Sequence, residues 1–484
     1  MQFGSEMDIL KKQFRLCRES RKEEPSEKWE STVVFLHRES LPNCWNIYEM
    51  RLPSCVKTES ERLVTSTGQL IHVRNNLVKV KGTLNSEEVV SPEKSNDFTI
   101  ARFERCIQQL PEAKNPIIKK LLIPEIAKVS IIRDREIPVI NKYDIMGIEG
   151  CPGAGKSTMC SNVVAKYIDK YKIIYLAPTH HQICNMAYKL IDKNIKFCVM
   201  SDESKLPRRL TKYHVSNDKH YEVKRRNVIP DDFPVVLSTV NKPLKSLSKL
   251  TKTIVIIDEA GRVSFLEAMA AIYAVKRLKF LLLAGDSMQL GCHSESNTQV
   301  MSCLSRLHQI NSTILKLRNQ FRFDGTTNYV ISTNFYDSEM IATAHKESKF
   351  AMIVLEGCVH DTTETCCEFE SYLVDKIMRM FEPGTITVMT PYKSQLNLLK
   401  KLEIDGQIID GVQGCEFDNG ILSLGRTNGI GFLTRRRLNV GLSRCSQNTI
   451  IIGHKPVIEK SKELSQILSI TDINNALITV DRAL

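Results

Sequence analysis

Residues 150–157 combine three glycines, a lysine and a serine at a fixed spacing. They read Gly-Cys-Pro-Gly-Ala-Gly-Lys-Ser, follow the apolar run 145–148 and precede a helix-like stretch. This pattern, G-x-x-x-x-G-K-[ST], lets successive backbone N–H groups point into one concavity, at the positive end of the helix that follows. There Lys156 can reach the β- and γ-phosphates of a nucleoside triphosphate, and Ser157 can bind Mg²⁺. The residues expected at the phosphates are Gly150, Cys151, Pro152, Gly153, Ala154, Gly155, Lys156, Ser157 and Thr158.

Two adjacent acids, Asp258 and Glu259, end an apolar run about a hundred residues later. The acid at the end of a buried strand can hold Mg²⁺ through water, and the next one can orient or deprotonate an attacking water. Another apolar run, 280–283, is followed by Gln289, which can sense the γ-phosphate from the carboxyl end of its strand. The combination favours hydrolysis of the γ-phosphate.

Two later segments carry arginines that suit the same chemistry. One is Gln320-Phe321-Arg322, and the other runs from Arg437 to Arg444. An arginine from a second domain can neutralise charge on the transferred phosphoryl group and make catalysis depend on domain closure. A single arginine in a basic chain is more often a surface charge, so these two matter only together with the other motifs.

The elements that would position these residues are buried strands alternating with helices from about residue 137. Short, nearly continuous apolar runs are typical of parallel strands covered on both faces. A second series begins near Ile314, so the pattern predicts two α/β units in tandem with one phosphate loop. The expected strands are 173–176, 235–237, 254–257 and 280–283, then 352–355, 386–389, 408–409, 420–423 and 449–452.

Four regions follow from this pattern. Residues 1–30 form a charged N-terminal helix, and 31–96 form a small β-rich, barrel-like accessory segment of short runs separated by turn residues. Residues 97–313 form the first α/β domain, with a helical lead-in interrupted by Pro111 and Pro116. The second α/β domain covers 314–484.

Composition excludes several other classes of protein. A chain with 42% apolar and 25% charged residues is typical of globular proteins. The net charge of +12 suits a polyanion, and residues 201–252 carry twelve Lys or Arg against six Asp or Glu. A solvated charged face explains that stretch equally well. The fifteen cysteines include no C-x-x-C pair, which indicates neither a zinc cluster nor a disulfide framework. Without a signal peptide or an apolar span, we expect a cytoplasmic or nuclear protein with no membrane partner.

The order and spacing of the motifs resemble those of superfamily 1 helicases. The resemblance is to the branch containing the nonsense-mediated-decay helicase and the nidovirus-type viral helicases, and it covers about residues 147–453. The segments that carry it are 150–157, 258–261, 285–290, 320–322, 412–416 and 437–444.

This resemblance implies two RecA-like domains with ATP, or another NTP, and Mg²⁺ in the cleft between them. The motor would move along single-stranded RNA or DNA, typically 5′ to 3′, and unwind duplexes. The roles carried over are phosphate and Mg²⁺ binding for Lys156 and Ser157, Mg²⁺ binding for Asp258, water activation for Glu259, coupling for Gln289, base stacking for Phe321, γ-phosphate contact for Arg322, ribose binding for Glu416 and the arginine finger for Arg444.

The strand-binding residues implied by the resemblance follow expected strands. They are Pro178, Thr179, Ser238, Thr239, Thr390 and Pro391. A Pro-containing turn explains each of these segments equally well when it is taken alone. The N-terminal region is a candidate for protein partners, and the motor is expected to be monomeric.

Two departures and one alternative stay open. No glutamine that could read adenine precedes the phosphate loop, so the base selectivity is open, and Gly291-Cys292-His293 stands where relatives usually have prolines. The alternative function is an ATP-switched clamp that grips nucleic acid with little unwinding. A kinase fits less well, because a second α/β unit with arginines suits a two-domain motor.

Overall fold

The computed structural model describes the chain outside a set of short segments. These are 1–6, 16–30, 42–44, 52–61, 66–69, 75–76, 82–86, 93–97, 123–128, 133–136, 138, 142–143, 201–202, 215–232, 242–251, 276, 293–299, 311, 344–346, 357–364, 383, 428 and 482–484. The chain divides into two compact units, one of residues 12–105 and one of residues 1–11 with 106–484.

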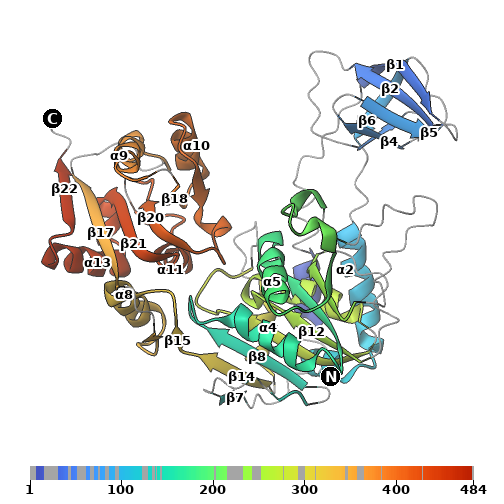
Figure 1. The fold of residues 1–484 in the computed structure, drawn as a ribbon, viewed down its shortest axis with the longest axis horizontal. Coiled ribbons are helices and arrows are strands. Elements are labelled where there is room, and N and C mark those ends of the chain that lie inside the picture. Colours follow the sequence, from blue (N-terminus) through green and yellow to red (C-terminus); the bar gives the residue numbers. More distant parts are fainter. Residues whose placement is uncertain are drawn as a thin grey trace. The chain divides into compact units, whose positions relative to one another are not determined.

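The smaller unit contains a closed antiparallel barrel (Figure 1). Its strand order is β1-β2-β5-β4-β3-β6, and a β-bulge interrupts the pairing of β1 with β2 between His37 and Glu39. Closure pairs every strand on both sides and leaves no open sheet edge. The predicted β-rich segment is therefore confirmed as a barrel. The strands are β1 (Ser31–Leu41), β2 (Trp45–Arg51), β3 (Arg62–Thr65), β4 (Leu70–Arg74), β5 (Leu77–Lys81) and β6 (Glu87–Pro92).

The lead-in to the first α/β domain is helical and is interrupted at its prolines. Pro111 lies in a short 3₁₀ helix and Pro116 begins a new helix, because proline cannot donate the backbone hydrogen bond of a helix interior. Residues 7–15 are also helical, with Met7 and Leu10 buried. The lead-in elements are α2 (Phe98–Gln109), η1 (Leu110–Glu112) and α3 (Pro116–Leu122).

The first domain is built on an eight-stranded parallel sheet. Its order is β10-β11-β9-β12-β13-β8-β14-β7, and its central strand β12 is buried along its whole length between β9 and β13. The strands are β7 (Val129–Ile132), β8 (Asp144–Gly150), β9 (Lys172–Ala177), β10 (Phe197–Met200), β11 (Val235–Thr239), β12 (Thr253–Ile257), β13 (Leu278–Gly285) and β14 (Ser312–Leu317). The helices are α4 (Lys156–Tyr167), α5 (His180–Asp192), α6 (Phe265–Tyr273) and α7 (Cys303–Leu307).

The second domain is built on a six-stranded parallel sheet with the order β19-β18-β20-β21-β17-β22 (Figure 1). Its strands are β17 (Glu347–Glu356), β18 (Ile386–Thr390), β19 (Gly406–Ile408), β20 (Phe417–Ser423), β21 (Cys445–His454) and β22 (Leu477–Asp481). Its helices are α8 (Gly325–Phe335), α9 (Glu368–Met378), α10 (Lys393–Lys401), α11 (Arg435–Leu442), α12 (Lys455–Glu459) and α13 (Lys462–Ile473). Two short strands, β15 (Asn319–Gln320) and β16 (Ile341–Ala342), precede β17 in the chain and form a separate two-stranded parallel sheet.

The two sheets confirm the predicted fold of tandem RecA-like α/β domains after a β-rich segment. One predicted boundary differs from the structure: the division at 313/314 falls inside β14. That strand pairs with β7 and β8, so Ile314 to Leu317 complete the first sheet.

Two predictions from composition concern residues that are only partly described. The basic stretch 201–252 includes 215–232 and 242–251, which lie outside the described residues. Among the helices that the structure does describe, none combines the length and the apolar character needed to cross a bilayer.

Candidate nucleotide-binding site

The glycine-rich loop joins β8 to α4 and has the conformation that its glycines allow. Gly153 and Gly155 have φ values of 73° and 80°, a left-handed conformation that costs side-chain-bearing residues energy. A Cβ at Gly153 would lie 2.7 Å from Cβ of Arg322, so this glycine also permits close approach of a second segment. The Lys156 ammonium donates to the carbonyl oxygens of Gly150 and Cys151 at 2.7 and 3.2 Å.

The carboxylate of Asp258 lies behind this loop at the end of β12. Its Oδ2 accepts hydrogen bonds from the hydroxyls of Ser157 at 2.7 Å and Tyr175 at 2.6 Å. Asp258 is 1% exposed. A buried carboxylate beside a serine hydroxyl is the oxygen-rich donor set that Mg²⁺ prefers.

The next residue, Glu259, has a left-handed backbone with φ of 50°. Its Oε2 accepts a hydrogen bond of 3.0 Å from the amide of Gln413, which follows the 3₁₀ helix η7 (Ile409–Gly411) of the second domain. Burial raises the pKa of the Glu259 carboxyl, and the positive charge of Lys156 opposes this shift. The carboxylate is therefore held by a hydrogen bond from across the domain interface.

A second acid, Asp286, connects Gln289 to the second domain. Its Oδ2 accepts from the Gln289 amide at 3.0 Å and from the Tyr336 hydroxyl at 2.7 Å. The amide of Asn439, in α11, donates to the Tyr336 oxygen and to the carbonyl of Met288, both at 2.9 Å. Burial raises the pKa of Asp286, opposed by Lys156 and by the Tyr336 hydrogen bond. Gln289 thus belongs to a continuous network that reaches α11.

The segment after β15 touches both domains. The backbone N–H of Phe321 donates to the carbonyl of Gly153 at 3.0 Å, and the Phe321 ring is 54% exposed. The Arg322 guanidinium donates to the carbonyl of Ser443 at 2.8 Å, and its Nε lies 3.0 Å from a carboxylate oxygen of Glu416. The side chain of Gln320 holds this turn, because it accepts from the backbone N–H groups of Arg322 and Phe323.

Arg444 is a buried arginine directly after α11. It donates to the carbonyls of Val440 and Cys415, at 2.9 and 3.4 Å, and to the hydroxyl of Ser443 at 2.9 Å. Burial lowers its pKa to about 10, with a further lowering from Arg322. The group therefore stays cationic at neutral pH.

These groups surround one cavity of about 1280 Å³. The predicted nucleotide-site residues in its lining are Pro152, Gly153, Ala154, Gly155, Lys156, Ser157, Thr158, Glu259, Gln289, Phe321, Arg322, Glu416 and Arg444. Gly150 and Cys151 instead line a smaller cavity of about 170 Å³, and Asp258 is buried behind Ser157. The structure thus brings together the predicted residues from both domains.

The predicted strand-binding residues are less uniform. Pro178, Thr179 and Thr239 are half-buried at the carboxyl ends of the paired strands β9 and β11, and Thr179 caps α5 in a reciprocal pair with Gln182. The side chains of Ser238, Thr390 and Pro391 are buried, and the Ser238 hydroxyl donates to the carbonyl of Met200. A phosphate contact from Ser238 or Thr390 would have to use the backbone or a rearranged loop, and Pro391 has no N–H group to donate.

Sequence reasoning missed several residues that hold the site. Gln413 and Asn439 lie inside motifs that were singled out, but nothing in their spacing indicates which acid or hydroxyl they would meet. Nothing in the sequence marks Tyr175 or Tyr336 as a site residue. Tyr175 is one aromatic residue within an apolar strand, and Tyr336 directly follows a helix.

Each of the two α/β domains matches a known protein family. Two family models, each described as an AAA domain, match residues 136–294 and 358–456.

Three similar proteins are helicases by name. The chain is 23% identical to the "ATP-dependent helicase NAM7" of Saccharomyces cerevisiae, over 70% of the chain and 43% of the relative. It is 24% identical to the Gallus gallus "DNA replication ATP-dependent helicase/nuclease DNA2" over 77% of the chain and 40% of the relative. It is 25% identical to the Schizosaccharomyces pombe "DNA polymerase alpha-associated DNA helicase A" over 43% of the chain and 38% of the relative. The chain spans less than half the length of these relatives.

Solved structures with detectable similarity include the arterivirus nonstructural protein 10 helicase. It is 17% identical, with a TM-score of 0.46 over 91% of this chain and 79% of that one. A complex of that helicase with DNA gives 16% identity and the same TM-score, over 90% and 79% of the two chains. Taken with the named relatives and both AAA matches, the motifs confirm that the chain resembles superfamily 1 helicases.

Proposed function

We propose that this chain is a nucleic-acid-dependent NTP hydrolase that moves along single-stranded RNA or DNA and unwinds duplexes. The observation that carries the proposal is the shared cavity. Lys156, Glu259 and Gln289 reach it from the first domain. Arg322 reaches it from the segment after β15, and Arg444 reaches it from the turn between α11 and β21. A cavity completed by two domains makes hydrolysis depend on their closure.

The phosphate loop would hold the triphosphate through its backbone N–H groups and Lys156. That lysine now donates to its own loop, so binding exchanges two carbonyl oxygens for phosphate oxygens. The hydroxyl of Ser157 and the carboxylate of Asp258 fit a Mg²⁺ ion, which would neutralise charge on the β- and γ-phosphates.

Glu259 would orient and deprotonate the attacking water. The hydrogen bond from Gln413 fixes one of its oxygens. Arg322 and Arg444 would stabilise the charge that develops on the γ-phosphoryl group, a contribution of about 10³- to 10⁵-fold in rate for arginine fingers.

The network from Gln289 through Asp286 and Tyr336 to Asn439 supports a coupling role. Loss of the γ-phosphate would change the partner of Gln289, and α11 would sense that change through three successive hydrogen bonds. Phe321 would stack on the base and Glu416 would bind the ribose. The half-buried residues Pro178, Thr179 and Thr239 would contact the nucleic-acid strand. The proposed motor is monomeric and moves 5′ to 3′.

A steady-state ATPase assay with and without single-stranded RNA or DNA tests the enzymatic part. We expect stimulation by polynucleotide, and loss of turnover in Lys156→Ala and Glu259→Gln. Since Glu259→Gln keeps the shape of the side chain, it should still bind ATP. If the wild-type protein binds ATP and polynucleotide but hydrolyses none, the enzyme proposal fails and the nucleotide-switched clamp replaces it.

A strand-displacement assay tests movement. Duplexes with a 5′ or a 3′ overhang, each made in RNA and in DNA, separate polarity from substrate class. Displacement from the 5′ overhang alone is the expected result, and displacement from the 3′ overhang alone would overturn the proposed polarity.

A further inference from the structure

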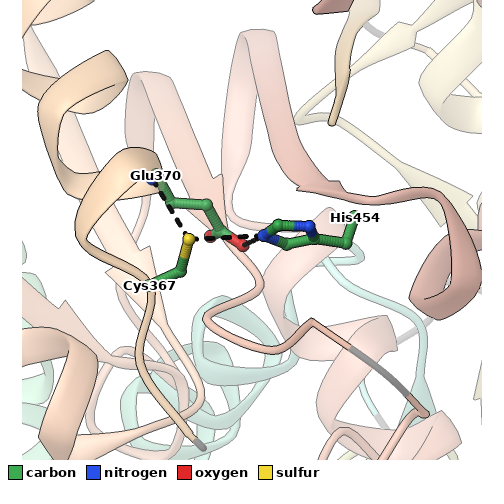
Figure 2. Close-up of side chains that lie close together, drawn as sticks. All are labelled: Cys367, Glu370 and His454. Atoms are coloured by element: carbon green, nitrogen blue, oxygen red, sulfur yellow. Dashed lines mark hydrogen bonds and ion pairs between the residues drawn. The ribbon is translucent and has the colours of Figure 1, made fainter. Parts of the chain in front are cut away.

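Three buried side chains of the second domain converge away from the nucleotide cavity (Figure 2). Cys367 caps the N-terminus of α9, Glu370 lies in the first turn of that helix, and His454 ends β21. Their exposures are 8%, 0% and 1%. A thiol, a carboxyl and an imidazole at one buried point form an unusual set for a hydrophobic core.

The donor atoms have the separations of ligands around one ion. Cys367 Sγ lies 3.3 Å from His454 Nε2, and that nitrogen lies 3.9 Å from Glu370 Oε1. All three donors lie within 4.8 Å of one another. A tetrahedral zinc ion, with a Zn–S bond of about 2.3 Å and Zn–N and Zn–O bonds of about 2.0–2.2 Å, separates its ligand atoms by about 3.4–3.6 Å. The two separations given above lie within about half an ångström of that geometry.

The carboxylate of Glu370 is oriented by its surroundings. Its Oε2 accepts from the hydroxyl of Ser423 at 2.6 Å and from the backbone N–H of Gly425 at 2.9 Å. Its Oε1 is buried without a hydrogen-bond partner, and it faces the imidazole and the thiol. A buried oxygen left unpaired in this way costs free energy, and a cation would remove that cost.

The amide of Gln395 extends this arrangement. It donates to the hydroxyl of Ser423 at 3.0 Å, and its oxygen accepts from the backbone N–H of Cys367 at 2.7 Å. One side chain therefore fixes both the helix start that carries the thiol and the hydroxyl that holds the carboxylate. Such outer hydrogen bonds are what orients the ligands in metal sites.

Charge balance favours a divalent ion. A thiolate and a carboxylate carry two negative charges, which one divalent cation neutralises in a region where an isolated charge is costly. The N-terminus of α9 stabilises both anionic ligands through its positive dipole.

We propose that Cys367, Glu370 and His454 bind one zinc ion. Thiolate, imidazole and carboxylate are all zinc ligands, and this mixture fits zinc better than Mg²⁺ or Ca²⁺, which prefer oxygen alone. A water or another donor takes the fourth position. The ion ties the start of α9 to the end of β21, and Gln395 links it to α10 beside the predicted strand-binding residues Thr390 and Pro391.

The full chain, purified without a histidine tag, allows a direct test by elemental analysis after dialysis against metal-free buffer. We expect about one zinc per chain, because a buried site of this kind retains its metal. The variants Cys367→Ser and His454→Gln should lose it. The matched control Cys366→Ser changes the adjacent thiol, which is half-buried and outside the cluster, and should retain it.

The variant Glu370→Gln separates loss of metal from loss of fold. Its side-chain oxygen can still accept from Ser423 and Gly425, so circular dichroism should remain that of the wild type while the zinc content falls. Cobalt provides a second readout: the cobalt-loaded wild type should show a thiolate-to-metal charge-transfer band, and cobalt-treated Cys367→Ser should not.

The proposal is overturned if the wild type holds no zinc and gives no cobalt band, in which case the three groups form only a hydrogen-bonded cluster. It is equally overturned if Cys367→Ser, Glu370→Gln and His454→Gln all keep the wild-type zinc content.

Discussion

The amide nitrogen of Gln413 lies 3.0 Å from Oε2 of Glu259, across 154 positions of the sequence. This hydrogen bond joins the second domain to the carboxylate that ends the Asp258–Glu259 pair of the first. Glu259 therefore has this partner only while the two domains are together. If Glu259 activates the attacking water, as we propose, its orientation depends on domain closure.

Replacing Gln413 by alanine should lower kcat for ATP by about 10- to 100-fold, because a hydrogen bond to a charged group is worth about 1.5–3 kcal/mol. The KM for ATP should change little, since Glu259 does not bind the phosphates in this proposal. Steady-state kinetics at saturating polynucleotide provide the measurement. Gln108→Ala, at an exposed position of α2 outside the lining of the cavity, is the matched control, and an equal loss in both variants would contradict the assigned role.

Alanine at Arg322 or Arg444 should reduce kcat by about 10³-fold or more while ATP still binds, because both charges act on the developing phosphoryl anion. Arg444→Lys should restore little, since lysine lacks the planar fork that reaches three acceptors. Turnover and fluorescent-nucleotide titration measure the two effects separately. Arg379→Ala, at the exposed C-cap of α9, should behave as the wild type.

The thiol of Cys151 should resist alkylation although it belongs to the phosphate loop. Burial raises its pKa to about 12, against a lowering by Lys156, so almost no thiolate exists near neutral pH. Cys415 is half-buried in the wall of the nucleotide cavity. With iodoacetamide at about pH 7.5, peptide mapping should show Cys415 modified first and protected by ATP. Equal rates at the two cysteines would contradict the structure.

The ion pair between His308 and Glu149 should make stability depend on pH. The imidazole lies 2.8 Å from the carboxylate, and that hydrogen bond raises the pKa of His308, while burial opposes the rise. The folded state thus favours the protonated ring. Its stabilisation is fully present below the unfolded-state pKa of about 6.5 and is lost as the pH rises through the folded-state value.

The melting temperature should therefore differ more between wild type and His308→Gln at about pH 5.5 than at about pH 8.5. The difference should be small, because the imidazole is 42% exposed and solvent screens the pair. A larger difference at the higher pH would reverse the assigned direction.

The sheets could be predicted because their strands carry local information. The run 254–257 is apolar at every position, and it forms the fully buried β12. The same property explains the displaced boundary at Ile314: strands of two consecutive parallel sheets have the same apolar pattern, so the pattern does not assign a strand to one sheet.

The contacts that complete the sites could not be predicted in the same way. Gln413 meets Glu259, and Cys367 meets His454 across 87 positions, only after the sheets have formed. The isolated cysteines indicated no metal cluster, because zinc motifs are recognised by short spacings and this cluster is assembled from two distant segments. The burial of Ser238 likewise follows from its place between neighbouring strands.

Phe321 and Arg322 are adjacent, yet their hydrogen bonds lead to different domains. The first is attached to Gly153 of the phosphate loop, and the second to Ser443 after α11. Separation of the domains must break the arginine contact but can leave the phenylalanine contact intact. A nucleotide held by its base and phosphates can then stay on the first domain through an opening event. We therefore expect release of product and movement of the second domain to be distinct kinetic steps, with rate constants that substitutions at these two neighbouring positions would change independently.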